Sequence, residues 1–229
     1  SRTRAFIVNS PSNPTGRIIP KENLRALARL AKEKNVVLVA DECYEAYDYE
    51  NAFASIMEFY AEAPEHLILA HTFSKSCAMT GWRIGFAVAS KDMISAMSNL
   101  HSHTVSGTAT MVQKAAVEAL RAGETAFPPI LAEYRKRRDL VVEALKKMPG
   151  VEVVKPEGAF YVFPAVRGAM ERIGASSTHE FCKRLLEEAH VAVVPGGEFG
   201  ADGYVRISYA VPEARLKEAL ERMGKFLNS

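Results

Sequence analysis

Short apolar runs alternate with longer segments in which apolar residues recur every three or four positions. The short runs are rich in β-branched residues and too short for helices, and they predict strands over residues 5–9, 36–40, 67–70 and 84–89. After Pro20, which suits a first helical turn, apolar residues fall on one helical face at Leu24, Leu27, Ala28 and Ala31. This alternation predicts an α/β fold with a parallel-rich sheet covered by helices.

From residue 90 the pattern becomes mainly helical. Met93, Ile94, Met97 and Leu100 share one face of a first helix. Two further helices are predicted near 108–121 and over 128–148, the second ended by Pro149-Gly150. Beyond them we expect strands over 151–154, 159–163, 191–194 and 204–208, and helices over 177–189 and 212–227. The chain therefore predicts two domains: a larger α/β domain over 1–127, and a long helix with a small α+β domain over 128–229.

Composition and charge exclude several classes of partner. The 229 residues carry a net charge of only +2, and the basic run Glu133–Asp139 suits the solvated face of a helix, so no nucleic-acid partner is predicted. No segment approaches the roughly 20 apolar residues of a membrane span. Cys43, Cys77 and Cys182 are odd in number and widely spaced, without a Cys-x-x-Cys pair. They favour a cytoplasmic location and predict no metal site.

Polar side chains follow three of the predicted strands. They are Asn13 after the first strand, Asp41 and Tyr44 after the second, and Thr72, Ser74 and Lys75 after the third. Ligands of open α/β sheets bind outside the carboxyl ends of the strands. We therefore expect these side chains to belong to one site.

The chemistry of the third group suits an aldehyde and a phosphate. A lysine made less basic by its surroundings can attack a carbonyl and form a Schiff base, which fits Lys75. The hydroxyls of Thr72 and Ser74, with the guanidinium of Arg83, suit the oxygens of a phosphate.

The other polar side chains suit an aromatic ring. Asp41 could hold a ring nitrogen protonated, and Tyr44 and Asn13 could donate hydrogen bonds to a phenolate-like oxygen. An aldehyde, a phosphate, a pyridinium and a phenolate on one molecule describe pyridoxal 5'-phosphate, or PLP.

Taken singly, the same residues have ordinary structural interpretations. Lys75 alone would be a surface lysine, and Asp41 would cap a turn or a helix. The segment Asn13–Gly16 alone is a good turn. Arg83 suits an exposed ion pair, and Tyr44 suits a half-buried position at a strand edge. Only their combination points to a site.

Four motifs carry a family resemblance. They are Asn-Pro-Thr-Gly at 13–16, Asp-x-x-Tyr at 41–44, Ser-Lys at 74–75 with Gly-x-Arg-x-Gly at 81–85, and Tyr-Val-Arg-Ile-Ser at 204–208. In this order they resemble the class I/II, fold-type I PLP-dependent aminotransferases, and are similar to bacterial and archaeal aspartate aminotransferases. The resemblance implies part of the PLP-transferase large domain followed by the small α+β domain.

The resemblance also implies a role for each residue. Lys75 would carry the cofactor covalently and move a proton at the substrate Cα. Asp41 would keep the pyridinium protonated, while Tyr44 and Asn13 would bind the phenolic oxygen. Phosphate would be bound by Thr72, Ser74 and Arg83. The substrate would be bound by Asn13 and by Arg206, which alternation alone would point to solvent. The Asn13–Pro14 bond is expected to be cis.

The implied reaction is amino transfer between an L-amino acid, with aspartate as first candidate, and a 2-oxo acid such as 2-oxoglutarate. A homodimer is implied as well. Family members carry roughly 150 or more residues before the first motif, a domain's worth, so we expect a fragment that binds PLP weakly and transaminates poorly alone. The same site would also suit a carbon-sulfur β-lyase, a cyclase or the PLP-sensing domain of a transcription regulator. A further alternative is that the chain is a structural fragment that is inert toward PLP.

Overall fold

The computed structural model describes residues 2–228, and the chain divides into two compact units. The first unit comprises the residues up to Ser12 together with Arg17–Leu131. The second comprises Asn13–Gly16 together with the residues from Ala132 on. The sequence placed a domain boundary after residue 127, and the assignment of a PLP-binding domain and a small domain stays a prediction.

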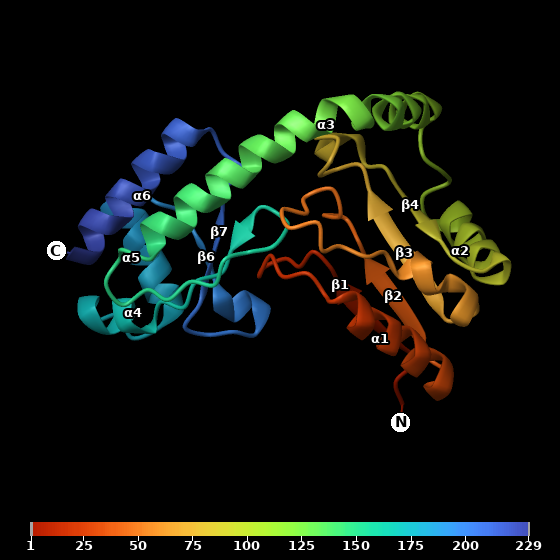
Figure 1. Ribbon diagram of the computed structural model, residues 1–229, viewed down its shortest axis with the longest axis horizontal. Coiled ribbons are helices and arrows are strands. Elements are labelled where there is room, and N and C mark those ends of the chain that lie inside the picture. The colour runs from red at the N-terminus through yellow and green to blue at the C-terminus, as the bar shows by residue number, and fades with distance from the viewer. Residues whose placement is uncertain (1, 229) are drawn as a thin grey trace. The chain divides into compact units, whose positions relative to one another are not determined.

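A four-stranded sheet forms the centre of the first unit (Figure 1). Its order is β1 (Ala5–Asn9), β2 (Val37–Asp41), β3 (Leu67–Thr72) and β4 (Gly85–Val88). The first three strands are parallel, and β4 runs antiparallel to β3. All four predicted strands are confirmed within a few residues. Since Asn9 pairs with Asp41, and Asp41 with Ala70, the carboxyl ends of the parallel strands meet at one edge.

Helix α1 (Lys21–Lys34) and the 3₁₀ helix η1 (Ile56–Glu62) pack on this sheet. The apolar face predicted for α1 is the buried one, as the spacing of its leucines and alanines requires. The core of the first unit joins α1, η1, β2 and β3 through Leu24, Ala28, Ala31, Leu38, Ala40, Ile56, Phe59, Leu67 and Leu69. This packing fixes β2 and β3, which lead directly into the site.

One prediction about the helical middle of the chain needs correction. The helix expected from residue 90 is confirmed as α2 (Lys91–Thr104), although it contains no buried residue and Leu100 on its apolar face is 67% exposed. The two helices expected near 108–121 and 128–148 are one helix, α3 (Thr110–Leu145), which contains Pro128 and Pro129. Proline removes a backbone N–H donor and crowds the preceding turn, so local rules predict an end or a kink here, yet the helix continues through both prolines.

The second unit has a three-stranded antiparallel sheet in the order β5 (Tyr161–Val162), β7 (Val205–Ser208) and β6 (Val194–Pro195). Three of the four strands expected here are present, although two are only two residues long. The strand predicted over 151–154 is wrong, because that segment makes one isolated bridge, from Glu152 to Ala165. The glycine-rich segment after β6 forms the 3₁₀ helix η3 (Gly196–Phe199).

Three helices accompany this sheet. They are α4 (Arg167–Ile173), which the sequence did not predict, α5 (Thr178–Ala189) and α6 (Glu213–Asn228). The hydroxyl of Ser177 accepts the Glu180 N–H and caps α5. Phe181 of α5 contacts Phe226 of α6 edge to face.

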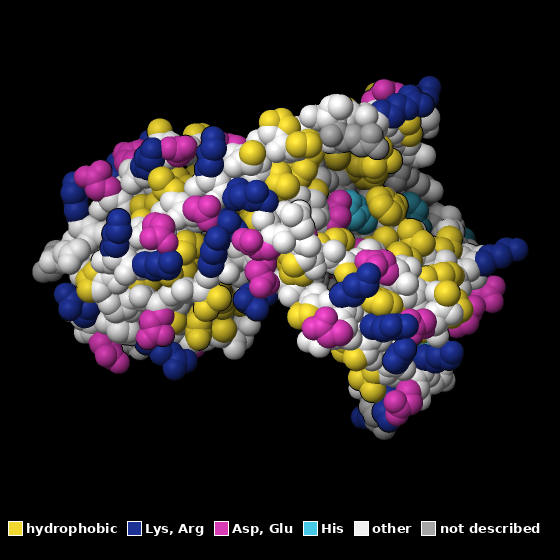
Figure 2. Space-filling model, viewed as in Figure 1, with side chains coloured by type: hydrophobic (Ala, Val, Ile, Leu, Met, Phe, Trp, Pro, Cys, Tyr) yellow, Lys and Arg dark blue, Asp and Glu magenta, His cyan; other side chains and the backbone are white. Residues whose placement is uncertain are grey.

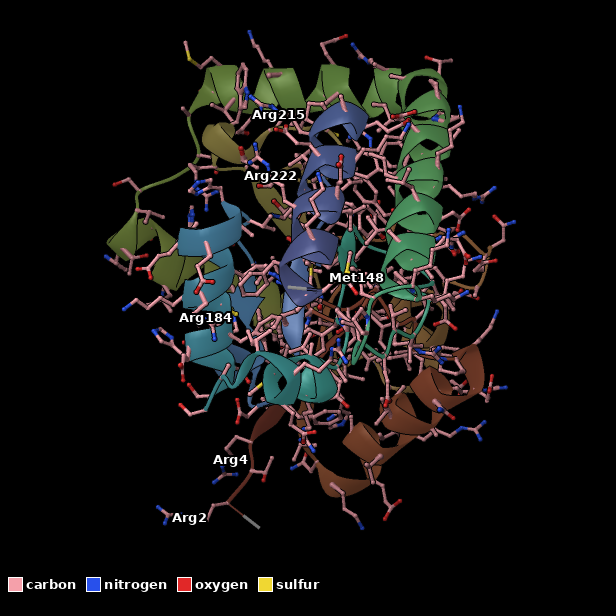
Figure 3. The ribbon with its side chains drawn as sticks, turned by 90° about the vertical axis from the view of Figure 1, so that its left-hand side faces the viewer. Arg2, Arg4, Met148, Arg184, Arg215 and Arg222 are labelled. Atoms are coloured by element: carbon pink, nitrogen blue, oxygen red, sulfur yellow. The ribbon has the colours of Figure 1, made fainter. Side chains whose placement is uncertain are left out.

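Charged side chains of both signs are interspersed on the visible surface (Figure 2). On α6, Arg215 and Arg222 both pair with Glu218 (Figure 3). The basic run near residue 135 is not wholly a solvated face as predicted, since Arg138 is only 2% exposed and donates to the Pro156 carbonyl. Within residues 2–228 we find no helix with the length and apolar character needed to cross a bilayer.

Candidate active site

Asp41 and Tyr44 lie at the carboxyl end of β2. The Asn9 amide donates to the Asp41 backbone carbonyl over 3.0 Å, which ties the ends of β1 and β2 together. The Asp41 carboxylate accepts the Cys43 N–H over 3.3 Å and so starts the turn that leads to Tyr44. Tyr44 is 3% exposed, so its ring is part of the core beneath the turn rather than a strand-edge aromatic.

Lys75 lies in the turn that follows β3. Its Nζ atom is 5.7 Å from the centre of the Tyr44 ring, within the range of a cation–π contact. The Lys75 carbonyl accepts the Ala78 N–H over 3.2 Å and the Tyr47 hydroxyl over 3.1 Å. The amine is therefore half-buried, beside Tyr44, on a backbone that two donors hold in place.

Thr72 and Ser74 form a hydroxyl pair directly before Lys75. The Thr72 hydroxyl donates to the Ser74 hydroxyl over 2.9 Å and accepts the Ser74 N–H over 3.1 Å. Arg83 is exposed, with a left-handed backbone (φ 53°), and its guanidinium donates to the Thr80 carbonyl over 3.0 Å. Two of the three predicted phosphate-binding side chains thus meet, while Arg83 is turned back onto its own turn.

Cys43 shares the environment of Asp41. Burial raises the pKa of the Cys43 thiol, and the neighbouring Asp41 carboxylate raises it further by its charge and by a hydrogen bond. A thiol with a raised pKa holds its proton more tightly and is a weaker nucleophile than a free cysteine.

Three titratable side chains behind this edge were not predicted. Glu42 is 4% exposed, and its carboxylate accepts the Ile56 N–H over 2.7 Å. Nε2 of His71 lies 2.9 Å from a carboxylate oxygen of Glu45, and the His71 ring stacks on Phe86. Glu45 follows Tyr44 and His71 precedes Thr72, so this pair links the turn after β2 to the end of β3, from which the turn with Lys75 starts. Sequence patterns give no signal for it, since the partners are 26 positions apart.

Glu42 gives a testable pH dependence. Burial raises its pKa above the ordinary value of 4.5, although the Ile56 N–H and the Ser55 hydroxyl oppose this. The folded state therefore holds the Glu42 proton more tightly than the unfolded state does. The stability that this proton contributes is complete below pH 4.5 and is lost as the pH rises through the pKa of Glu42 in the folded state. Glu42→Gln keeps an acceptor for Ile56 but cannot ionise. Urea unfolding of the variant should show a smaller loss of stability above pH 4.5 than the wild type.

The exposed Glu65 supplies the control for this measurement. Glu65→Gln should reproduce the wild-type pH dependence of the free energy of unfolding. If Glu42→Gln also showed the wild-type pH dependence, that result would contradict a raised pKa of Glu42.

Asn13 and Arg206 meet in the second unit. Nη1 of Arg206 donates to the Asn13 side-chain oxygen over 2.9 Å, although 193 positions separate the two residues. The Arg206 guanidinium lies among aromatic rings and does not point to solvent as strand alternation alone would place it: its Cζ atom is 4.6 Å from the centre of the Tyr161 ring and 5.1 Å from that of Phe199. The Asn13–Pro14 bond is cis, as predicted, and so is Ser10–Pro11, which was not predicted.

The last position of the turn at 13–16 requires a glycine, Gly16. Its φ is +67°, and a Cβ atom there would lie 2.4 Å from a Pro156 side-chain atom and 2.8 Å from the Gly158 carbonyl. The Gly16 carbonyl accepts the N–H groups of Glu157 and Gly158, each over 2.8 Å. The backbone of the turn is therefore fastened within the second unit, which holds Asn13 beside Arg206.

Comparison with known proteins decides the family. The model of the family described as aminotransferase class I and II matches residues 1–223. The chain belongs to this family. The resemblance predicted from the four motifs is thereby confirmed, and the match covers nearly all of the chain.

Individual members agree with this assignment. An aspartate aminotransferase of Pyrococcus horikoshii is 44% identical over 98% of the chain. The crystal structure of an aspartate aminotransferase from Thermotoga maritima is 42% identical over 99% of the chain, with a TM-score of 0.88. An aromatic aminotransferase from Pyrococcus horikoshii is 40% identical over 99%, with a TM-score of 0.91. The predicted α/β fold of this enzyme family is therefore confirmed.

The chain is shorter than these members. It spans 57% of the length of the Pyrococcus aspartate aminotransferase, 57% of the Thermotoga chain and 60% of the aromatic aminotransferase chain. The expectation of a fragment agrees with this coverage.

Proposed function

We propose that this chain carries the cofactor lysine and the carboxylate-binding arginine of a PLP-dependent aminotransferase. The reaction would transfer an amino group between an L-amino acid and a 2-oxo acid. The observation that carries the proposal is the placement of Lys75 in the turn after β3, beside Tyr44 and next to the Thr72–Ser74 hydroxyl pair.

The side chains of the first unit fit PLP by their chemistry. The Thr72 and Ser74 hydroxyls would donate to the phosphate, and Arg83 would join them after rotating away from the Thr80 carbonyl. Asp41, an acceptor at the end of β2, would hold the ring nitrogen protonated. Tyr44 would donate to the phenolic oxygen, and Lys75 would bind the aldehyde carbon covalently. When bound, PLP supplies an electron sink for negative charge that develops at the substrate Cα.

The residues of the chain would then perform two tasks. Lys75, once its amine is free, would take the proton from the substrate Cα and hold it as an ammonium group that can donate it again, which is the role of a general acid–base group. Arg206 would bind the substrate carboxylate through paired charge-assisted hydrogen bonds, and Asn13 would orient the guanidinium and contact the ligands. Fixing the carboxylate fixes the direction of the Cα–H bond.

Aspartate and 2-oxoglutarate are the first substrates to test. Two of the relatives described above are named aspartate aminotransferases, while the third is named an aromatic aminotransferase, so aromatic amino acids come next. The proposal also includes a cytoplasmic location and a homodimer, both implied by the family resemblance.

Isotope transfer tests this function. With PLP present, ¹⁵N-aspartate and 2-oxoglutarate should give ¹⁵N-glutamate, detected by mass spectrometry, at a slow rate for the 229-residue chain. A chain that binds PLP but forms no ¹⁵N-glutamate, and no labelled product from aromatic donors, would contradict amino transfer. Release of pyruvate and ammonia from cystathionine without amino exchange would instead identify a β-lyase.

A further inference from the structure

The aromatic surroundings of Arg206 exceed what carboxylate binding requires. Both the Tyr161 and the Phe199 rings lie within about 6 Å of the guanidinium carbon, where a cation is attracted to a ring face. Tyr161 is buried, and its strand β5 pairs with β7 so that Tyr161 faces Ser208, two residues after Arg206. The contact therefore comes from paired strands and not from mobile segments.

Phe199 reaches Arg206 from a tightly closed turn. It ends η3, where the Gly196 N–H donates to the Tyr204 carbonyl over 2.7 Å and the Ala201 N–H donates back to the Gly196 carbonyl over 2.9 Å. A Cβ atom on Gly196 would lie 2.2 Å from the Ala201 carbonyl, so the turn closes only with glycine there. Phe163 contacts the Phe199 ring edge to face at 5.8 Å. The glycine-rich segment is thus a closed turn that holds one aromatic ring beside Arg206.

The N–H groups of the Arg206 guanidinium differ in whether they have a hydrogen-bond partner. A guanidinium has five N–H donors, which form a side edge from Nε and one terminal nitrogen and an end edge from the two terminal nitrogens. Nη1 donates to Asn13. Nε is buried and has no hydrogen-bond partner among residues 2–228. The side edge is therefore covered, and the end edge is the one left for an anion.

We propose that Tyr161 and Phe199 are positioning residues that hold the Arg206 guanidinium in one plane and cover its Nε edge. A carboxylate of an amino acid or a 2-oxo acid then binds end-on, at Nη1 and Nη2. Asn13 restrains the guanidinium further through its hydrogen bond with Nη1. The inference rests on the proposed carboxylate-binding role of Arg206 and adds which edge is used and what holds it.

Hydrogen exchange at the guanidinium tests the covering of Nε directly, without cofactor or turnover. In the ¹⁵N-arginine-labelled chain, the Arg206 Nε–H signal is identified by its loss in Arg206→Lys. Its exchange with water should be at least roughly tenfold slower than that of the exposed Arg215, because exchange requires local opening. Phe199→Leu and Tyr161→Leu should each accelerate it, whereas Tyr161→Phe, which keeps the ring, should not.

A core substitution elsewhere in the same unit is the matched control. Phe181→Leu weakens the contact between α5 and α6, where Phe181 packs against the Phe226 ring. Measured well below its melting temperature, this variant should keep the slow Nε–H exchange. Acceleration in Phe181→Leu equal to that in the ring variants would attribute the effect to general loosening and overturn the inference.

Titration with maleate, an unreactive dicarboxylate, tests the edge and the affinity. Binding should shift the Arg206 Nη signals more than its Nε signal, and each leucine variant should weaken binding by roughly 3- to 30-fold, the loss of one ring contact. A larger shift at Nε, or wild-type exchange and affinity in both leucine variants, would overturn the inference. If Arg206→Lys bound maleate as well as wild type, the proposed carboxylate role would fail, while the exchange data would still decide the role of the rings.

Discussion

Replacing Lys75 by alanine is expected to abolish covalent attachment of PLP to this chain. The wild-type chain, treated with PLP and then borohydride, should gain the mass of one reduced cofactor, and peptide mapping should place it on Lys75. The amine is half-buried beside Tyr44, and Tyr47 and Ala78 hold its backbone, so it is presented in one orientation. Alanine offers neither a nucleophile nor a base.

Loss of both roles should also remove activity. Amino transfer in Lys75→Ala should fall by at least roughly 10²–10⁴-fold, the usual contribution of one general acid–base group. Lys91→Ala is the matched control, because Lys91 is an exposed lysine at the start of α2. That variant should be labelled and should react as wild type does. Labelling of the Lys75→Ala chain at another lysine, to the wild-type extent, would contradict the assignment of Lys75.

Local patterns predicted the elements of the first unit because local packing decides them. The strands β1, β2 and β3 are continuous apolar runs, and the apolar stripe of α1 is the face that packs on the sheet. The predictions that failed concern segments where contacts distant in sequence decide. Residues 151–154 are apolar and extended in pattern, but only Glu152 finds a bridging partner. The α3 helix passes through Pro128 and Pro129, which local rules treat as an end.

The candidate site divides in the same way. The turns that carry Asp41, Tyr44 and Lys75 could be brought together from sequence because the carboxyl ends of parallel strands share one edge. The contacts that surround these groups could not be predicted from the sequence. The Tyr47 hydroxyl on the Lys75 carbonyl depends on a side chain 28 positions away, and no spacing rule relates the two. The roles of the site residues themselves stay predictions.

Two side-chain pairs, Glu45–His71 and Arg206–Asn13, have different relations to the candidate site. The first pair joins the turn after β2 to the end of β3, and neither of its members is assigned to a ligand. Both members of the second pair are proposed to bind ligands, and a hydrogen bond joins them within the second unit. Substitutions at His71 should therefore act through Tyr44 and Thr72, whereas substitutions at Arg206 should act on the carboxylate directly.

Asp41→Asn is expected to reduce amino transfer by roughly 10²–10³-fold, the usual cost of removing one electrostatic group from a preorganised site. The amide still accepts the Cys43 N–H, and the backbone bond from Asn9 is untouched, so the fold should hold. Only the negative charge that would keep the ring nitrogen protonated is lost. Covalent labelling at Lys75 should persist, which separates loss of the electron sink from loss of the cofactor. The exposed Asp92, changed to Asn, should keep wild-type transfer. Equal rates in Asp41→Asn and wild type would place the partner of the ring nitrogen elsewhere in the protein.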